Sequence, residues 1–335
     1  MLTGWDHAVG VCVRLSGMSN HSNPAGSHSG HSTGLVDLLV HSSVGTPLTR
    51  DGIALFPLYL HGPTAGTTTV VTGAGADVSI TEQASAEVPT IIAENRQPQP
   101  VLLIDGQVVE GGRQTRTLNV SVLLDGHTRL PIPVSCVEAG RWNGGIDFRH
   151  SGQMINRRVR RAKHLGVEQS IRSHGAKRSD QGAVWSAISS ELDALGVASQ
   201  SSAFTAAADR LDRDSLGRKV REIQAMGPLP GQCGVVVAHG RRIVSMEVFA
   251  TPAMLAAHWN AIVQAVFLDT PARLDGTPSA TKALRFVRHM AKGDARTAPG
   301  VGLGTEHHVR TRYVAGQALV HDGMVVHASA FALAA

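Results

Sequence analysis

Residues 101–116 read Val101-Leu-Leu-Ile-Asp105-Gly-Gln-Val-Val-Glu110-Gly-Gly-Arg113-Gln-Thr-Arg116. In this stretch, which is the most informative about the fold, short apolar runs alternate with glycines and with charged or amide side chains. Apolar runs of this length between turn residues are typical of buried strands. Comparable runs recur between Gly and Pro residues at 53–60, 68–72, 78–81, 118–124 and 130–134. The pattern predicts antiparallel β-structure over the first half of the chain. In the last run Pro131 and Pro133 lack N–H donors, so we expect an edge strand or a bulge there.

Helical spacing of apolar residues begins after Phe148 and changes the expected architecture. It predicts helices at 154–174, 181–195, 202–226, 252–268 and 279–291. Strands are expected at 232–238 and 242–249, as a hairpin around Gly240, and again over 305–331. The predicted class is α+β, with an antiparallel β-rich core, sandwich- or barrel-like, interrupted by a helical block.

The predicted domain organisation is one α+β domain over residues 51–335, with a helical insertion at about 150–228. Residues 1–50 are expected to form a disordered extension, because their central part is rich in Gly, Ser and His and has no apolar period.

Composition narrows the class of protein. With 335 residues, of which 42% are hydrophobic, the chain has enough apolar material for a sizeable core. It has neither an apolar run of about 18 residues nor a signal-peptide pattern, so we expect a cytoplasmic protein without a membrane partner. Its three cysteines, Cys12, Cys136 and Cys233, form no Cys-x-x-Cys pair, which indicates reduced thiols. No metal site is predicted, and the sequence indicates no particular cofactor.

Arg113, Gln114 and Arg116 are the first candidate ligand-binding residues. Guanidinium groups suit phosphates and carboxylates, and the glycines at 111 and 112 let the backbone approach a ligand closely. On a regular strand Arg113 and Arg116 point to opposite faces, so they share a pocket only if the two glycines twist the chain. The alternative is a pair of structural salt bridges.

Glu110, Glu138 and Cys136 are the candidate catalytic residues. A carboxylate near arginines stays ionised, which suits a base, although the same carboxylates could only balance the arginine charges. Cys136 is a nucleophile only with a nearby base, and a buried structural cysteine is the commoner case. Arg141 and Trp142 complete the candidate binding set, because the indole could stack on a nucleotide ring or could cap the core.

Two motifs also carry a family resemblance: Leu-Leu-Ile-Asp-Gly-Gln-Val-Val-Glu-Gly-Gly-Arg-Gln-Thr-Arg at 102–116 and Val-Ser-Cys-Val-Glu-Ala-Gly-Arg-Trp at 134–142. From about Asp51 onward the chain resembles the ARG and Rhodanese-Phosphatase-superfamily-associated Protein domain. Members of that family usually have Gln-Asn-Arg where this chain has Gln114-Thr115-Arg116. The family's name records an association with ADP-ribosyl glycohydrolases and phosphatase-like domains, which implies work near NAD-derived or ADP-ribose compounds.

The sequence therefore leads to three functional hypotheses. The first is a protein that binds or processes an ADP-ribose- or NAD-related nucleotide, with hydrolysis of a nucleotide-like small molecule as the assumed reaction. The second is a non-catalytic domain that binds such a ligand or a modified partner. The third, which is not favoured, is an RNA-associated protein that uses the basic run at 157–178, because that run has no accompanying recognition motif.

Overall fold

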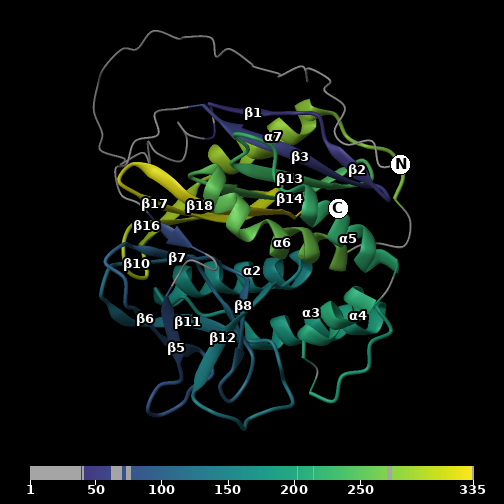
Figure 1. Cartoon of the computed structure of the whole chain (residues 1–335). Coiled ribbons are helices and arrows are strands. Elements are labelled where there is room, and N and C mark those ends of the chain that lie inside the picture. Colours follow the sequence, from purple (N-terminus) through teal and green to yellow (C-terminus); the bar gives the residue numbers. More distant parts are fainter. Residues whose placement is uncertain are drawn as a thin grey trace, which may run out of the picture.

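Two β-sheet bodies make up the fold, and helices α2 (Arg157–His174) and α6 (Pro252–Leu268) lie between them (Figure 1). This computed structural model describes residues 39, 41–61, 70–72, 77–201, 203–213, 215–269 and 274–333, apart from the side chains of 212, 213 and 215. The predicted α+β class with an antiparallel, β-rich core is confirmed.

The larger body is a nine-stranded antiparallel sheet. Its strands follow one another across the sheet in this order: β1 (Ser42–Val44), β3 (Ile53–Leu60), β13 (Gly234–His239), β14 (Arg242–Phe249), β18 (Met324–Ala332), β17 (Val314–His321), β16 (Thr305–Arg310) and β15 (Ala295–Pro299). Strand β2 (Leu48–Arg50) pairs with β3. The predicted hairpin at Gly240 joins β13 to β14.

Both faces of this sheet are covered, because successive side chains of its central strands point to opposite sides. Phe56 and Val236 belong to the core that packs against α7 (Ala280–Ala291). Leu55 and Val237 belong to the core that includes α6. A strand buried on both faces reads as a continuous apolar run, which explains why these strands are visible in the sequence.

The second body is a closed barrel. Its strands run in the order β11 (Arg129–Cys136), β6 (Thr90–Asn95), β5 (Val78–Thr81), β12 (Asp147–Met154), β8 (Gln107–Gly111) and β9 (Arg116–Leu118). A small sheet of β10 (Val122–Leu124), β7 (Val101–Leu103) and β4 (Val71–Thr72) lies beside it. Pro131 and Pro133 lie in the part of β11 that pairs with β6 alone, so the missing N–H groups face no strand.

The barrel and the helical block are inserted into the large sheet. The chain leaves the sheet after β3 and returns at β13, where Leu58 and Gly234 are neighbours across the two strands. Between these points lie the barrel, α2, α3 (Gln181–Ala194), α4 (Thr205–Arg213) and α5 (Ser215–Met226). Asn156 caps the start of α2 by accepting a hydrogen bond from the backbone N–H of Val159.

Several expectations need correction. Strand β12 occupies residues where helical spacing was expected to begin, and its polar sequence is well buried only at Phe148 and Met154, so it has little hydrophobic signal. Strands β6 and β8 were not predicted, and the helix expected at 202–226 is two helices, α4 and α5.

The expected extension at 1–50 lies mostly outside the described residues. Its last ten residues contain β1 and β2, both of which pair with β3, so the fold includes residues before position 51. Across the described residues, none of the helices combines the length and hydropathy needed to span a bilayer.

Candidate functional site

The two sequence motifs meet at the end of the barrel. Strand β9 pairs with the end of β11, and Arg116 lies directly opposite Cys136. Gln181 at the start of α3 fixes the backbone of Cys136, since its amide accepts from the Cys136 N–H at 2.9 Å and donates to the Cys136 carbonyl at 2.8 Å. The 110–116 and 136–142 segments therefore form one site.

Glu138 is the centre of the hydrogen-bond network in this site. Its Oε2 accepts from the backbone N–H of Thr115 at 3.0 Å, from the Thr115 hydroxyl at 2.8 Å and from Arg141 Nε at 2.9 Å. Its Oε1 accepts from the Ser201 hydroxyl at 3.1 Å. Thr115 thus supplies both a backbone donor and a side-chain donor to Glu138.

These contacts keep Glu138 ionised. Burial raises the pKa of the Glu138 carboxyl, but hydrogen bonds from Arg141 and Thr115, together with the Arg141 charge, outweigh it and lower the pKa to about 2. A carboxylate held this tightly positions its neighbours and is a weak proton acceptor at neutral pH.

The low pKa makes stability at this site depend on pH. The folded value lies below the usual 4.5, so Glu138 stabilises the fold fully above about pH 5 and loses that contribution as the pH falls toward 2. We expect Glu138→Gln to lower the free energy of unfolding by about 2 kcal/mol at pH 7, and the gap from wild type to narrow by pH 3. Urea unfolding at both pH values measures this. Glu94→Gln, at an exposed ion pair, is the control, and an equal gap at both pH values would contradict the prediction.

Arg141 holds the glycine turn that shapes the site. It donates from Nη1 to the Gly112 carbonyl at 2.9 Å and from Nη2 to the Gly111 carbonyl at 3.1 Å. Both glycines have positive φ, and a Cβ on Gly112 would lie 2.2 Å from the Phe148 ring, so only glycine fits there. All three guanidinium nitrogens of Arg141 therefore donate hydrogen bonds within the protein.

Arg116 differs from Arg141, because its guanidinium is only partly engaged. The side chain is completely buried, and Nη1 donates to Gln114 Oε1 at 2.9 Å. Among the described residues, Nε and Nη2 have no hydrogen-bond partner, and one oxygen of the buried Glu82 also lacks one. Burial lowers the pKa of Arg116, while the nearby Cys136 and Glu82 favour its charged form.

Cys136 is a neutral thiol in this arrangement. Burial raises its pKa, and hydrogen bonding with Glu138 and the Arg116 charge only partly oppose that effect. Its Sγ donates to the Glu138 carbonyl at 3.1 Å. The thiol thus packs beneath the site and helps to orient the Glu138 backbone.

The remaining binding candidates lie around this centre. Arg113 is exposed and uses only its backbone N–H, which donates to Glu82 Oε1 at 2.8 Å, so the two arginines of the first motif do not share a pocket. Gln114 is buried and donates to the Glu138 carbonyl at 3.1 Å. Trp142 is 45% exposed, and the Arg116 guanidinium lies 5.6 Å from its ring centre.

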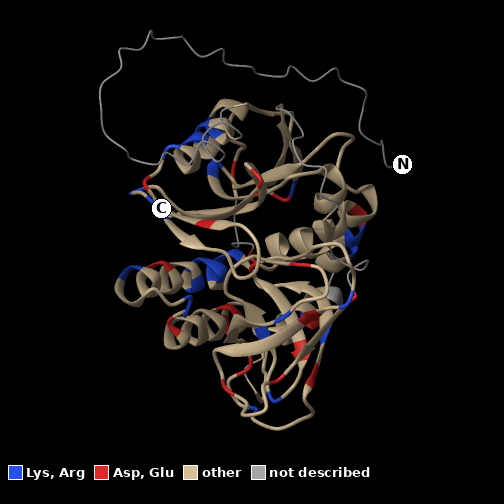
Figure 2. Ribbon diagram, turned by 90° about the vertical axis from the view of Figure 1, so that its left-hand side faces the viewer, with Lys and Arg blue, Asp and Glu red and all other residues tan. Residues whose placement is uncertain are grey.

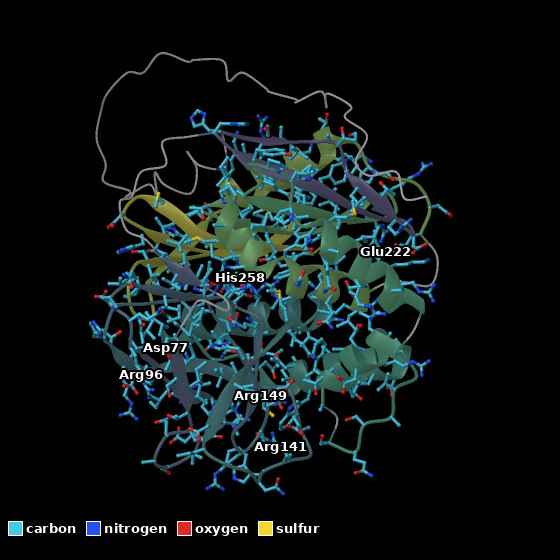
Figure 3. The ribbon with its side chains drawn as sticks, viewed as in Figure 1. Asp77, Arg96, Arg141, Arg149, Glu222 and His258 are labelled. Carbon is cyan, nitrogen blue, oxygen red and sulfur yellow. The ribbon has the colours of Figure 1, made fainter. Side chains whose placement is uncertain are left out.

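A pocket of 480 Å³ opens beside Glu138, in the barrel part of the molecule that Figure 3 marks by Arg141 and Arg149. It is lined by Glu110, Gly111, Thr115, Glu138, Arg141, Asp147, Phe148, Arg149 and Thr205. Three of these residues are carboxylates and two are arginines. Glu110 pairs with the exposed Arg149 at 2.7 Å, and no other side-chain partner of Glu110 is found among the described residues.

A buried charge cluster between the two β bodies was not predicted. Asp105 accepts from Arg160 Nη2 at 2.9 Å and from Lys163 Nζ at 3.3 Å, and hydrogen bonds with His164 Nε2 at 2.7 Å. Burial raises the pKa of Asp105, but these neighbours hold it well below its usual range. The available signal was the spacing of 160, 163 and 164, which places them on the buried face of α2 with Val159.

The cluster extends to the large sheet. Arg160 also bonds Glu247 on β14, and His327 on β18 hydrogen bonds with Glu247 Oε2 at 3.0 Å. The charges of Asp105 and Glu247 balance those of Arg160 and Lys163. The cluster is therefore a satisfied network that joins the barrel, α2 and the sheet.

The basic run at 157–178 does not form one exposed face, because Arg160 and Lys163 are buried in that cluster. Over the ribbon as a whole, Lys and Arg are spread through the helices and both β bodies, with Asp and Glu among them (Figure 2). Arg157 and Arg158 form ion pairs with Asp269, and Arg158 also pairs with Glu191. Further along the run, Arg172 pairs with Glu168 and Lys177 with Glu306. Most of the charge that suggested RNA binding is therefore neutralised within the protein.

A family model for the ARG and Rhodanese-Phosphatase-superfamily-associated Protein domain matches residues 41–331. The chain belongs to this family. The match includes β1 and β2 as well as both motifs, so the family fold comprises the sheet, the barrel and the helical block together. No curated protein and no solved structure matches the chain.

Proposed function

We propose that this family member binds and hydrolyses a nucleotide-like small molecule related to ADP-ribose or NAD in the 110–142 segment. The observation that carries the proposal is Arg116: it is a fully buried cation with two guanidinium nitrogens that have no partner among the described residues. Leaving such donors unsatisfied costs free energy, which a phosphate oxygen of a ligand would recover.

The surroundings of Arg116 suit the other parts of a nucleotide. Trp142 is covered by the guanidinium on one side and remains 45% exposed, so it offers aromatic surface for a base. Glu110 and Asp147 line the adjacent pocket, and carboxylates accept hydrogen bonds from ribose hydroxyls. That pocket has more carboxylates than arginines, so phosphate contact is assigned to Arg116. Arg116 is buried and does not line the pocket, so this assignment requires Trp142 to turn away from the guanidinium when the ligand binds.

Hydrolysis requires a base that takes a proton from the attacking water. Glu110 fits this role best, because it faces the pocket and has one exposed ion-pair partner. Glu138 serves as a positioning residue that holds Arg141 and Thr115. Cys136 contributes packing and is no nucleophile in this scheme.

A non-catalytic binding domain is the second candidate function. Two observations favour it: all the hydrogen bonds to Glu138 come from the protein, and the Cys136 thiol is protonated. Of the three predicted catalytic residues, Glu110, Glu138 and Cys136, this leaves Glu110 as the candidate base. Turnover with Glu110→Gln separates the two functions. Loss of ADP-ribose or NAD hydrolysis with retained binding supports the enzyme, whereas binding without turnover in the wild type supports the binding domain.

Arg116→Met is expected to weaken ADP-ribose binding by about tenfold or more, because it removes the charged donors and keeps most of the side-chain volume. Isothermal titration calorimetry on the wild type and the variant measures this. Arg113→Ala is the matched control, since that side chain is exposed and only its backbone N–H is used. Unchanged affinity in Arg116→Met, or equal loss in both variants, would refute the assignment of the phosphate to Arg116.

A further inference from the structure

A second pocket, of 640 Å³, lies where the β13–β14 hairpin turn meets the start of α2. It is lined by Arg157, His239, Gly240, Arg241, Arg242, Val244, Leu274 and Asp275. None of these residues belongs to the 110–142 site. The pocket is larger than the one beside Glu138, and its charge has the opposite sign.

Arginine dominates this lining. Arg157, Arg241 and Arg242 face one carboxylate, Asp275. Arg157 uses Nε to bond Asp269 at 2.5 Å, and no other partner of its guanidinium is found in the described part of the chain. Arg241 lies against the backbone of Gly276, where a Cβ would come within 2.7 Å of its Nε. No hydrogen bond or ion pair of the Arg241 guanidinium is found in the described part of the chain.

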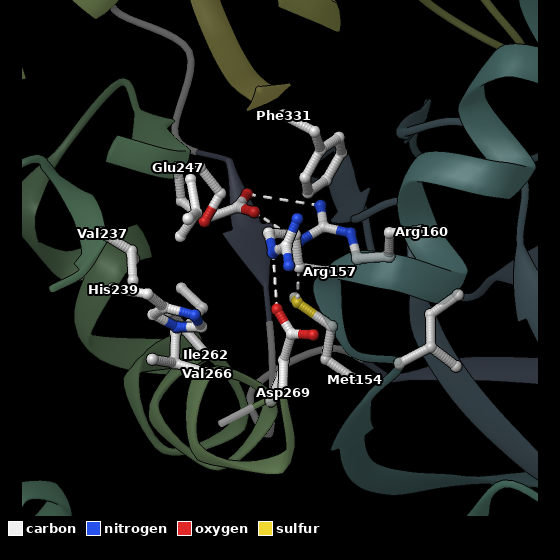
Figure 4. Close-up of a pocket in the computed structure, with 14 residues that line it drawn as sticks. Met154, Arg157, Arg160, Val237, His239, Glu247, Ile262, Val266, Asp269 and Phe331 are labelled. Atoms are coloured by element: carbon white, nitrogen blue, oxygen red, sulfur yellow. Dashed lines mark hydrogen bonds and ion pairs between the residues drawn. The ribbon is translucent and has the colours of Figure 1, made fainter. Parts of the chain in front are cut away.

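One lining residue of the pocket carries an unsatisfied polar atom. His239 is only 7% exposed, and its Nε2 has no hydrogen-bond partner among the residues that the structure describes. The same histidine also lines an inner cavity of about 20 Å³, which reaches Glu247 and Asp269 and is large enough for one water molecule (Figure 4). His239 thus connects the open pocket to the polar interior.

From this geometry we infer that the pocket is a second binding site, for a small molecule with a phosphate group. The terminal nitrogens of the three arginines match phosphate oxygens, which guanidinium forks bind in pairs. His239 lines the same pocket, and its Nε2 has no partner among the described residues, so a ligand contact there would relieve a costly unpaired polar atom. This inference does not rest on the proposed function, because the two sites share no residue.

Calorimetric titration with inorganic pyrophosphate tests the second site. The variant Arg241→Gln with Arg242→Gln changes two exposed side chains, so we expect it to fold and to bind pyrophosphate about tenfold more weakly than the wild type. Arg113→Gln is the control, because it removes an exposed arginine that lines neither pocket and should bind like the wild type. His239→Gln should also weaken binding, since the buried contact is altered.

Four other outcomes of these titrations would overturn the inference. A wild type that does not bind pyrophosphate, or a double variant that binds as tightly as the wild type, shows that the arginines hold no phosphate. Tighter binding of citrate than of pyrophosphate shows that the site selects carboxylates. Loss of pyrophosphate binding in Arg116→Met, with none in the double variant, assigns the phosphate to the 110–142 site and removes it from this one.

Discussion

Asp105→Asn is expected to lower the free energy of unfolding by about 3–5 kcal/mol, the range for breaking a buried ion pair from one side. Asp105 is completely buried, and it is the acceptor shared by Arg160, Lys163 and His164. Asparagine keeps the size but removes the charge, so Lys163 stays buried with no carboxylate at hydrogen-bond distance. Burial already lowers the pKa of Lys163 to about 8 in the presence of Asp105.

Urea unfolding at pH 7 measures this loss, with Asp51→Asn as the control. Asp51 pairs with Lys219 at 2.9 Å, but both side chains are about 40% exposed, so its removal should cost no more than about 1 kcal/mol. Its φ of 49° is also one that asparagine tolerates. Equal losses in the two variants would show that the buried cluster contributes no more than a surface pair.

If Asp105→Asn fails to fold, a compensating variant still tests the explanation. Adding Lys163→Met removes the uncompensated charge, so the double variant should be more stable than Asp105→Asn alone. A double variant that is less stable than the single one would contradict the idea that unpaired charge causes the loss.

Gly106→Ala is expected to cost about 2–5 kcal/mol, the sum of backbone strain and overpacking. Gly106 has a φ of 78°, and a Cβ there would lie 2.5 Å from Arg160 Nε. Arg160 cannot move aside freely, because Asp105 and Glu247 hold its guanidinium from two sides.

Gly152→Ala separates the two contributions in thermal or urea unfolding. Gly152 has a similar φ of 70°, yet a Cβ there would meet nothing within 4 Å. It should therefore show only the backbone strain of about 1–2 kcal/mol. If Gly106→Ala cost no more than Gly152→Ala, the close approach of Arg160 to the backbone would be refuted.

Elements buried on both faces could be predicted from the sequence. The expected ranges 53–60, 242–249 and 252–268 coincide with β3, β14 and α6, because the length of each apolar run and the turn residues at its ends distinguish a strand from a helix. Strand β12, with the sequence Asp-Phe-Arg-His-Ser-Gly-Gln-Met, was not predicted, because this strand is stabilised mainly by pairing with β8 and β5. Pairing depends on residues far away in sequence, which local patterns do not report.

The candidate site shows the same limit. The motifs at 110–116 and 136–142 were singled out by their residue types, but only strand pairing shows that Arg116 is opposite Cys136. The buried cluster could not be assembled from sequence, because Asp105, Lys163 and Glu247 come from a loop, a helix and a distant strand. The only sign of the cluster in the sequence was the spacing of residues 160, 163 and 164, which places them on one face of α2.

The insertion of the barrel between β3 and β13 has a consequence during synthesis of the chain. Strand β3 cannot pair with β13 until about 175 further residues have been synthesised, the separation of Leu58 from its neighbour Gly234. At translation rates of about 5–20 residues per second, that delay is on the order of ten to thirty seconds. Throughout it the apolar segment Ile53–Leu60 has an unpaired edge, which is where nascent chains aggregate. We therefore expect chaperones that bind extended apolar segments to engage β3 on the ribosome until the barrel and helices have emerged.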